Sequence, residues 1–127
     1  MTLGLLCVLL AFVLPVAWAY VARYPYFDFD IRRPRDWAAS QTGWRQRALW
    51  AQANAWESFA PFAAAVLVAH YLEADQSVID WLAGAFVALR VLHGLFYIAD
   101  RPALRALAWW ASFAATISLF VVAFRPD

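Results

Sequence analysis

The residues best suited to chemistry lie on one stripe of a long apolar segment. Arg47, Asn54 and Glu57 are separated by seven and three residues, so in a helix they share one face. The segment that carries them, residues 43–71, is apolar enough to lie in lipid. An ionisable side chain in a membrane helix is costly and usually faces a bundle interior or a water-filled cavity. The stripe therefore predicts a functional site inside a membrane protein.

A second polar face lies on the next predicted helix of the chain. Arg90, His93 and Tyr97 are spaced by three and four residues and so lie side by side. The two helices run antiparallel, and at about 1.5 Å rise per residue Asn54 and Arg90 both lie about 15 Å from the same end of the bundle. Glu57 lies one turn deeper. We therefore expect Glu57 and Arg90 to form an ion pair that offsets part of the cost of burying them.

The two faces together predict a polar wall. Its members are Arg47, Asn54, Glu57, Arg90, His93 and Tyr97. Guanidinium groups bind carboxylates bidentately and a carboxylate accepts an ammonium group, so the wall suits a small zwitterion with more than one carboxylate. The alternative is a set of buried contacts that only fixes helix packing. The sequence shows no metal-binding spacing, no glycine-rich phosphate loop and no catalytic triad.

The composition predicts an all-α integral membrane protein. Hydrophobic residues make up 65% of the 127 residues and charged residues 15%, whereas soluble domains are about half apolar. The excess lies in four long stretches, so we expect a single domain, residues 1–127, folded as a four-transmembrane-helix bundle. The predicted helices cover residues 3–22, 43–71, 78–98 and 102–123. Cys7 is expected to be a packed apolar side chain.

Two features of the first 43 residues allow alternative interpretations. Ala17-Trp18-Ala19 resembles a signal-peptidase site, but no basic region precedes the apolar run, so we favour a retained membrane helix. Residues 23–43 are polar, rich in arginine and interrupted by Pro25 and Pro34. We favour an irregular, solvated loop whose arginines lie near lipid headgroups. The alternative is a lid over an anion-binding site.

Arginine bias predicts the orientation in the membrane. The first and third loops carry arginines, whereas the loop between the second and third long helices carries only acids. The positive-inside rule therefore places both termini outside the cytoplasm. The short loops and compact chain favour a multi-pass protein of a bacterial inner membrane. With no lysine and a net charge of +1, nothing indicates a nucleic-acid partner.

Two motifs resemble a known family. The first is Arg47-Ala48, then Ala51-Gln52-Ala53-Asn54-Ala55-Trp56-Glu57, then Pro61-Phe62; the second is Arg90-Val91-Leu92-His93, then Tyr97, then Arg105. In this order, on the second and third long helices, they resemble the MAPEG family, the membrane-associated proteins in eicosanoid and glutathione metabolism. The length and four-helix topology are similar over nearly the whole chain.

The resemblance implies a homotrimer that binds glutathione as co-substrate between subunits, near the cytoplasmic side, while apolar substrates arrive from the lipid. It implies that Asn54 and Glu57 hold the peptide part of glutathione, that Arg90 lies beneath it, and that His93 and Tyr97 line the pocket. Arg47 belongs to the same predicted cofactor-binding set. The catalytic arginine would be Arg105 or Arg101. A nearby guanidinium lowers the pKa of a thiol, and the thiolate is the nucleophile.

Three functions follow as hypotheses. The first is a membrane glutathione transferase or peroxidase that acts on apolar electrophiles. The second is a non-catalytic lipid-binding or scaffold protein, because some family members have arginines where this chain has Trp50 and Ala53. The third is a small exporter built around Glu57, which its polar neighbours make a weaker hypothesis.

Overall fold

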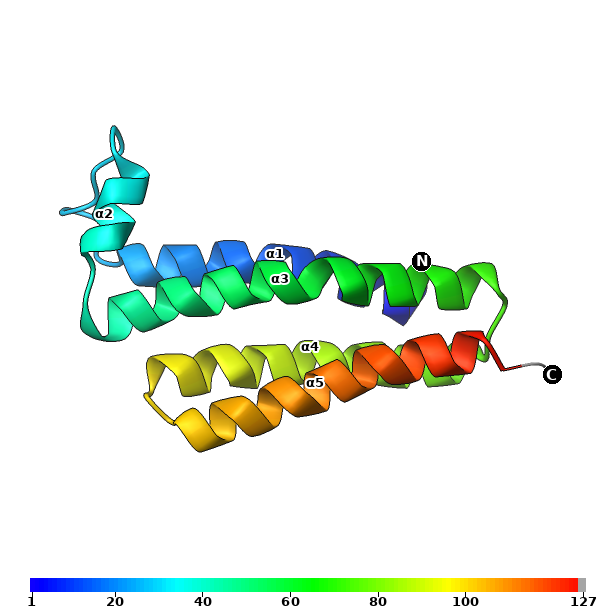
Figure 1. The fold of residues 1–127 in the computed structure, drawn as a ribbon. Helices are drawn as coiled ribbons and strands as arrows, with labels where there is room; N and C mark the ends of the chain where they lie inside the picture. Colours follow the sequence, from blue (N-terminus) through cyan, green and yellow to red (C-terminus); the bar gives the residue numbers. More distant parts are fainter. Residues whose placement is uncertain (126–127) are drawn as a thin grey trace.

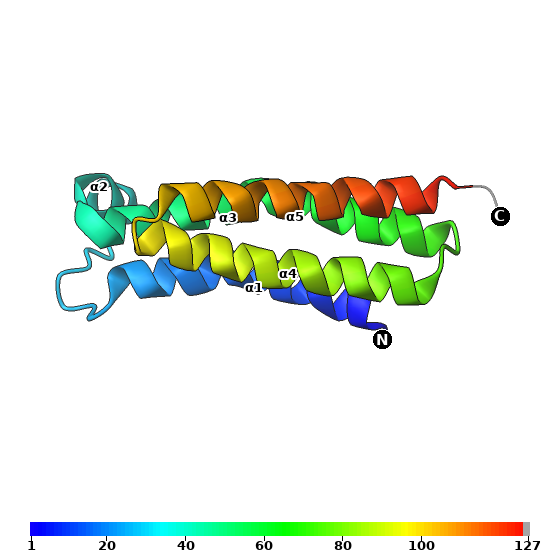
Figure 2. The same cartoon turned by 90° about the horizontal axis from the view of Figure 1, so that it is seen from below.

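The computed structural model describes residues 1–125, and five helices run through them (Figure 1). Their bounds are α1 Leu3–Arg23, α2 Pro34–Ser40, α3 Gly43–Tyr71, α4 Gln76–Ile98 and α5 Pro102–Ala123. The four long helices form an antiparallel bundle in which α1 packs along α3 and α4 packs along α5. The N-terminus and the end of α5 lie at the end of the bundle opposite to α2 (Figures 1 and 2).

Aromatic and small side chains hold the two helix pairs together. Phe62 of α3 stacks on Phe86 of α4 with ring centroids 3.7 Å apart, and both side chains are buried. Gly94 lets α1 approach α4, because a Cβ atom there would lie 2.2 Å from the Trp18 ring. Cys7 is buried, as expected of a packed apolar side chain. These contacts fix the relative positions of the helices that carry the polar residues.

Three of the helices are long and apolar enough to cross a membrane. They are α1, α4 and α5, and they confirm the expected integral membrane protein. The third helix, α3, has 29 residues but does not belong to this group, because polar residues such as Arg45, Arg47 and Glu57 interrupt its first half. The fourth span therefore stays a prediction.

The start of α4 differs by two residues from the predicted start at residue 78. The helix begins at Gln76 because Asp75 caps it: its Oδ1 atom accepts hydrogen bonds from the N–H groups of Ser77, at 2.8 Å, and Val78, at 3.2 Å. An aspartate at this position satisfies donors that a helix start leaves free.

The expectation of an irregular loop between the first two long helices is wrong for Pro34–Ser40. These residues form α2, because proline at the first position of a helix loses no hydrogen bond and has the right φ. Trp37 of α2 packs edge-on against Phe29, with ring centroids 5.1 Å apart. Arg45, at the start of α3, forms an ion pair with Asp28. The segment is therefore held to the end of the bundle.

Candidate functional site

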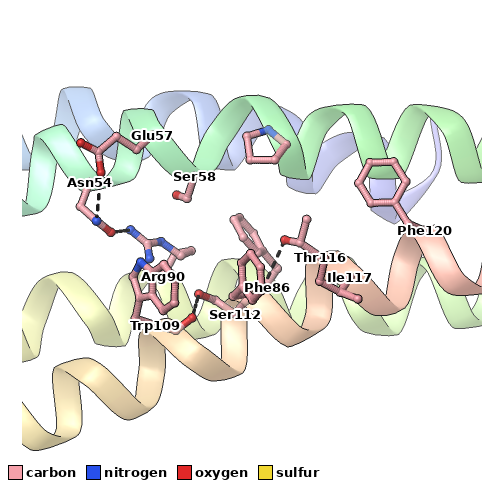
Figure 3. Close-up of a pocket in the computed structure, with 12 residues that line it drawn as sticks. Asn54, Glu57, Ser58, Phe86, Arg90, Trp109, Ser112, Thr116, Ile117 and Phe120 are labelled. Carbon is pink, nitrogen blue, oxygen red and sulfur yellow. Dashed lines mark hydrogen bonds between the residues drawn. The ribbon is translucent and has the colours of Figure 1, made fainter.

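The side-chain amide of Asn54 bridges Arg90 and Glu57 (Figure 3). Arg90 Nη2 donates a hydrogen bond to Asn54 Oδ1 at 2.6 Å, and Asn54 Nδ2 donates one to Glu57 Oε2 at 3.2 Å. A guanidinium group only donates and a carboxylate only accepts, so the charges on the two sides fix which way the amide points.

The expected ion pair between Glu57 and Arg90 is wrong. Within residues 1–125 the one ion pair is that of Arg45 and Asp28. Arg90 lies level with Asn54 and bonds to it, whereas Glu57, one turn deeper, is exposed and lines the same cavity between α3, α4 and α5 as Arg90. The positive and negative charges are therefore linked through an amide instead of touching.

Arg90 is the unusual member of this group. Its side chain is only 2% exposed, and its Nε and Nη1 atoms have no hydrogen-bond partner among residues 1–125. Buried polar groups nearly always have partners, because an unpaired one loses its hydration without compensation. A buried cation with two unused donors is what a binding site for an anion would present.

Three cavities have Asn54 in their walls. The inner cavity, of about 270 Å³, lies between α3, α4 and α5 and includes Arg90. The α3 groove, of about 340 Å³, is more open and is lined by Trp50, Ala53, Asn54, Glu57 and Tyr97. The α4–α5 groove, of about 300 Å³, is lined by residues that include His93, Tyr97, Arg105 and Trp109. Asn54 is thus the common boundary of all three.

Arg105, His93 and Tyr97 lie together at the α4–α5 groove. Its guanidinium carbon lies 4.3 Å from the centroid of the Tyr97 ring, and the rings of His93 and Tyr97 meet edge-on at 5.5 Å. Cation–π attraction and ring packing hold the three side chains in place. Arg101, the other candidate, is exposed at the start of α5 and lines none of the three cavities.

Arg47 lies apart from the predicted wall. Its Nε atom donates a hydrogen bond to the backbone carbonyl of Ile98 at 3.1 Å. That carbonyl belongs to the last turn of α4, where helix carbonyls lack partners within the helix. Arg47 lines none of the three cavities, so its observed contact is with the end of α4.

The contribution of α5 to the inner cavity was not expected from the sequence. Trp109, Ser112 and Thr116 line it, together with Ser58 of α3. The helix reads as apolar all round, but Ser112 and Thr116 are four residues apart and so share a face. Small hydroxyl residues at this spacing often mark the packed side of a membrane helix, and this signal would have found the face. No group of His, Cys, Asp and Glu in residues 1–125 is arranged to hold a metal ion.

Comparison with known proteins gives one family. A family model described as the MAPEG family matches residues 3–125, which include all five helices. Comparisons with curated proteins and with solved structures find no match.

Proposed function

Because the chain belongs to the MAPEG family, whose members generally use glutathione as substrate or cofactor, we propose that it binds glutathione and activates the thiol towards apolar electrophiles. The proposed place is the α3 groove and the α4–α5 groove. These two cavities share Asn54 and Tyr97, so one extended ligand lying over these residues would reach both.

The observation that carries the proposal is the bridging amide of Asn54. Its position is fixed by charged groups on both sides, so a ligand meets a preorganised amide. Glu57 is exposed beside it and suits the ammonium group of a peptide. His93 and Tyr97 form the wall of the pocket, and Arg90 lies beneath and orients Asn54.

Arg105 is the residue we assign to the thiol. Its guanidinium group lines the α4–α5 groove, where it would stabilise a thiolate and lower the pKa of the thiol. The thiolate sulfur then attacks an electrophilic carbon, forms a C–S bond and expels the leaving group with its electron pair. With a hydroperoxide, the sulfur attacks the outer oxygen and becomes a sulfenic acid, while the inner oxygen leaves as an alkoxide that takes up the thiol proton to give the alcohol. A second glutathione thiol then attacks the sulfenic sulfur, forms the disulfide and releases water.

The outer side of α3 supports assembly with further copies. Trp50 and Glu57 are both exposed there, and an exposed carboxylate at this depth would otherwise face lipid, which is costly. A neighbouring subunit would cover it and allow α3 to serve as the fourth span. The homotrimer and the placement of both termini outside the cytoplasm remain part of this proposal.

Calorimetry with glutathione and the purified protein in detergent tests the proposal. We expect saturable binding that Glu57→Ala and Arg90→Ala each weaken at least about tenfold, since a lost hydrogen bond to a charged group has about this effect. Glu73→Ala is the matched control, because Glu73 is an exposed carboxylate in the loop before α4. Absence of binding to the folded wild-type protein, with a glutathione-binding relative measured alongside, would contradict the proposal.

A second candidate is a non-catalytic lipid-binding or scaffold protein. Trp50 and Tyr97 favour it, because their ring centroids lie 6.2 Å apart and give the α3 groove an aromatic wall. The same calorimetry separates the two candidates, since a scaffold of this kind would bind no glutathione at physiological concentrations.

A further inference from the structure

The segment between α1 and α3, residues 24–42, contains three arginines that the proposed function does not use. Arg32, Arg33 and Arg35 are exposed, and their guanidinium groups form no hydrogen bond or ion pair within residues 1–125. They line none of the three cavities around Asn54, as a lid over the candidate site would do. These guanidinium groups can therefore bind an anionic group from outside the subunit.

The three aspartates of the segment form no ion pair with these arginines. Asp28 pairs with the arginine near the start of α3. Asp30 Oδ1 accepts hydrogen bonds from the backbone N–H groups two and three residues further on, at 2.8 and 3.2 Å. Asp36 lies in the first turn of α2, where the positive end of a helix favours a carboxylate. Residues 23–45 contain five arginines and three aspartates and therefore have a net charge of +2.

Two large apolar side chains precede these arginines and lie almost entirely outside the fold. Phe27 is 86% exposed and Ile31 is 83% exposed. Tyr24 and Tyr26 are exposed in the same segment, and tyrosine is enriched where a membrane meets water. A segment that presents apolar side chains next to cations is typical of a membrane surface, where the apolar groups enter the acyl boundary and the cations meet the headgroups.

The arrangement of the helices places this segment at the membrane surface. It joins the end of α1, a membrane-spanning candidate, to the start of α3. In Figure 1, α2 stands out to the side of α1 and α3, away from α4 and α5, instead of extending the bundle along its axis. With the long helices across the membrane, a segment in this position lies along the surface at the level of the headgroups.

Contacts with the bundle hold the segment in this position. Arg45 Nη2 donates a hydrogen bond to the carbonyl oxygen of Tyr24 at 2.8 Å. The hydroxyl group of Tyr26 donates one to the carbonyl oxygen of Tyr20 in α1 at 3.1 Å. The backbone that carries the three arginines therefore loses little conformational entropy when a ligand binds.

We propose that this segment binds anionic phospholipids. The guanidinium groups of Arg32, Arg33 and Arg35 hold the phosphate of the headgroup, and Phe27 and Ile31 enter the acyl boundary beside it. Guanidinium groups donate to phosphate oxygens in pairs, and the net positive charge of the segment favours an anionic lipid over a zwitterionic one. A second copy of the chain would bring the same positive segment to this end of the bundle, so charge favours lipid as the occupant. This inference does not depend on the proposed function, because the segment lines neither groove assigned to glutathione.

Spin labels in the full-length protein, in nanodiscs of phosphatidylcholine and phosphatidylglycerol, test whether the apolar side chains enter the bilayer. Cys7→Ala removes the single native thiol, and Phe27→Cys or Ile31→Cys carries the label. Relaxation by oxygen reports lipid around the label, whereas relaxation by a nickel chelate reports water. We expect strong relaxation by oxygen and weak relaxation by the chelate at both sites. The matched control is Thr42→Cys, an exposed position of the same segment, where the chelate should act more strongly.

Two results of the labelling experiment would overturn the proposed insertion. Strong relaxation by the nickel chelate at both sites would show that the side chains are solvated. Weak relaxation by both reagents would show that protein covers them, and a neighbouring subunit would then be the occupant instead of lipid.

Equilibrium binding tests the selectivity for charge. Radiolabelled dioctanoyl phosphatidylglycerol is compared with dioctanoyl phosphatidylcholine on the full-length protein in an uncharged detergent. We expect saturable binding of the anionic lipid, at least about fivefold tighter than that of the zwitterionic lipid, since one arginine near a membrane surface has about this effect. The preference should fall as the salt concentration rises. Equal affinities for the two lipids would overturn the proposal.

A triple variant localises the headgroup site. Arg32→Gln, Arg33→Gln and Arg35→Gln together should leave the fold intact, because the three side chains are exposed. The variant should lose the preference for phosphatidylglycerol, while binding of phosphatidylcholine stays the same. Arg125→Gln is the matched control, because Arg125 is an exposed arginine at the other end of the bundle, and it should keep the preference. A preference that survives the triple variant would contradict this location.

Discussion

Two polar clusters in the bundle differ in how fully their hydrogen-bonding groups are used. The terminal cluster joins the start of α1 to the facing ends of α3 and α4, and its members are Thr2, Gly4, His70, Gln76 and Asp80. His70 Nδ1 contacts the carbonyl of Val66 at 2.8 Å, so it donates, and Nε2 accepts from Thr2 Oγ1 at 2.9 Å. Asp80 Oδ1 accepts from Gly4 N at 2.7 Å and from Gln76 Nε2 at 2.8 Å.

The central cluster, formed by Asn54, Glu57 and Arg90, is incompletely paired. Arg90 is buried with two free donors, and Glu57 accepts one hydrogen bond from Asn54. This difference gives a criterion for telling polar clusters that stabilise the fold from polar clusters that bind a ligand. A cluster whose groups satisfy one another stabilises the fold, whereas one that buries unused donors is available to a ligand.

The largest expected effect concerns Arg105, the proposed catalytic arginine, which lies beside the central cluster. Arg105→Ala should lower kcat/KM for glutathione conjugation about 10²- to 10³-fold, the usual effect of removing one charge-stabilising donor. It should also raise the pKa of the bound thiol, which the ultraviolet absorbance of the thiolate measures against pH. Arg101→Ala is the matched control, because Arg101 lies in the same turn region but lines none of the three cavities. A larger loss from Arg101→Ala would reverse the assignment.

One variant in each cluster tests the difference between the terminal and the central cluster. Asp80→Ala leaves the Gly4 N–H and the Gln76 amide without their acceptor, so we expect unfolding in detergent to cost about 1–3 kcal/mol less, with glutathione affinity unchanged. Asn54→Ala should instead weaken glutathione binding at least about tenfold. Thermal unfolding and calorimetry on both variants provide the measurements. If Asp80→Ala left the stability unchanged and weakened glutathione binding, the assignment of the terminal cluster to stability and of the central cluster to binding would be contradicted.

The smallest effect is a pH dependence at the start of α4, close to the terminal cluster. The Ser77 hydroxyl, and then the N–H groups of Val78 and Ser77, hold the pKa of Asp75 below its usual range. Since the folded-state pKa is depressed, the stabilisation is present above the unfolded-state pKa of about 3.9 and is lost as pH falls through the folded-state value.

Asp75→Asn keeps a good capping side chain but cannot titrate. Its melting temperature should therefore lie slightly below that of the wild-type protein at neutral pH, and the two values should converge below about pH 4. The measurement is thermal unfolding against pH. A constant difference across this range would show that the charge of Asp75 contributes nothing.

Sequence periodicity and composition predicted the main architecture because apolar runs and helix boundary signals are local. Pro102 opens α5 and Gly43 opens α3, as the sequence indicated. The short helix α2 was missed because seven residues give too little periodicity to separate a helix from a polar loop, and packing of Trp37 on Phe29 helps hold it.

At the candidate site, helical spacing predicted which residues share a face of their helix, but not the contacts between the helices. Helical spacing placed Asn54, Arg90 and His93 correctly on their faces, but not the rotation of α3 about its own axis. The Asn54 amide lies between Glu57 and Arg90 and bonds to both, so the ion pair does not form. Arg47 was assigned to the wall because spacing alone does not reveal the partner, which is the carbonyl of Ile98.

The position of Asn54 as a shared wall has a thermodynamic consequence. Its amide has one oxygen and one nitrogen facing groups of opposite charge, so any ligand that draws the Arg90 guanidinium away from Oδ1 also changes the contact with Glu57. Occupancy of the inner cavity and occupancy of the outer grooves would then be linked by one free energy. By reciprocity, whatever factor the first ligand imposes on the affinity of the second, the second imposes on the first.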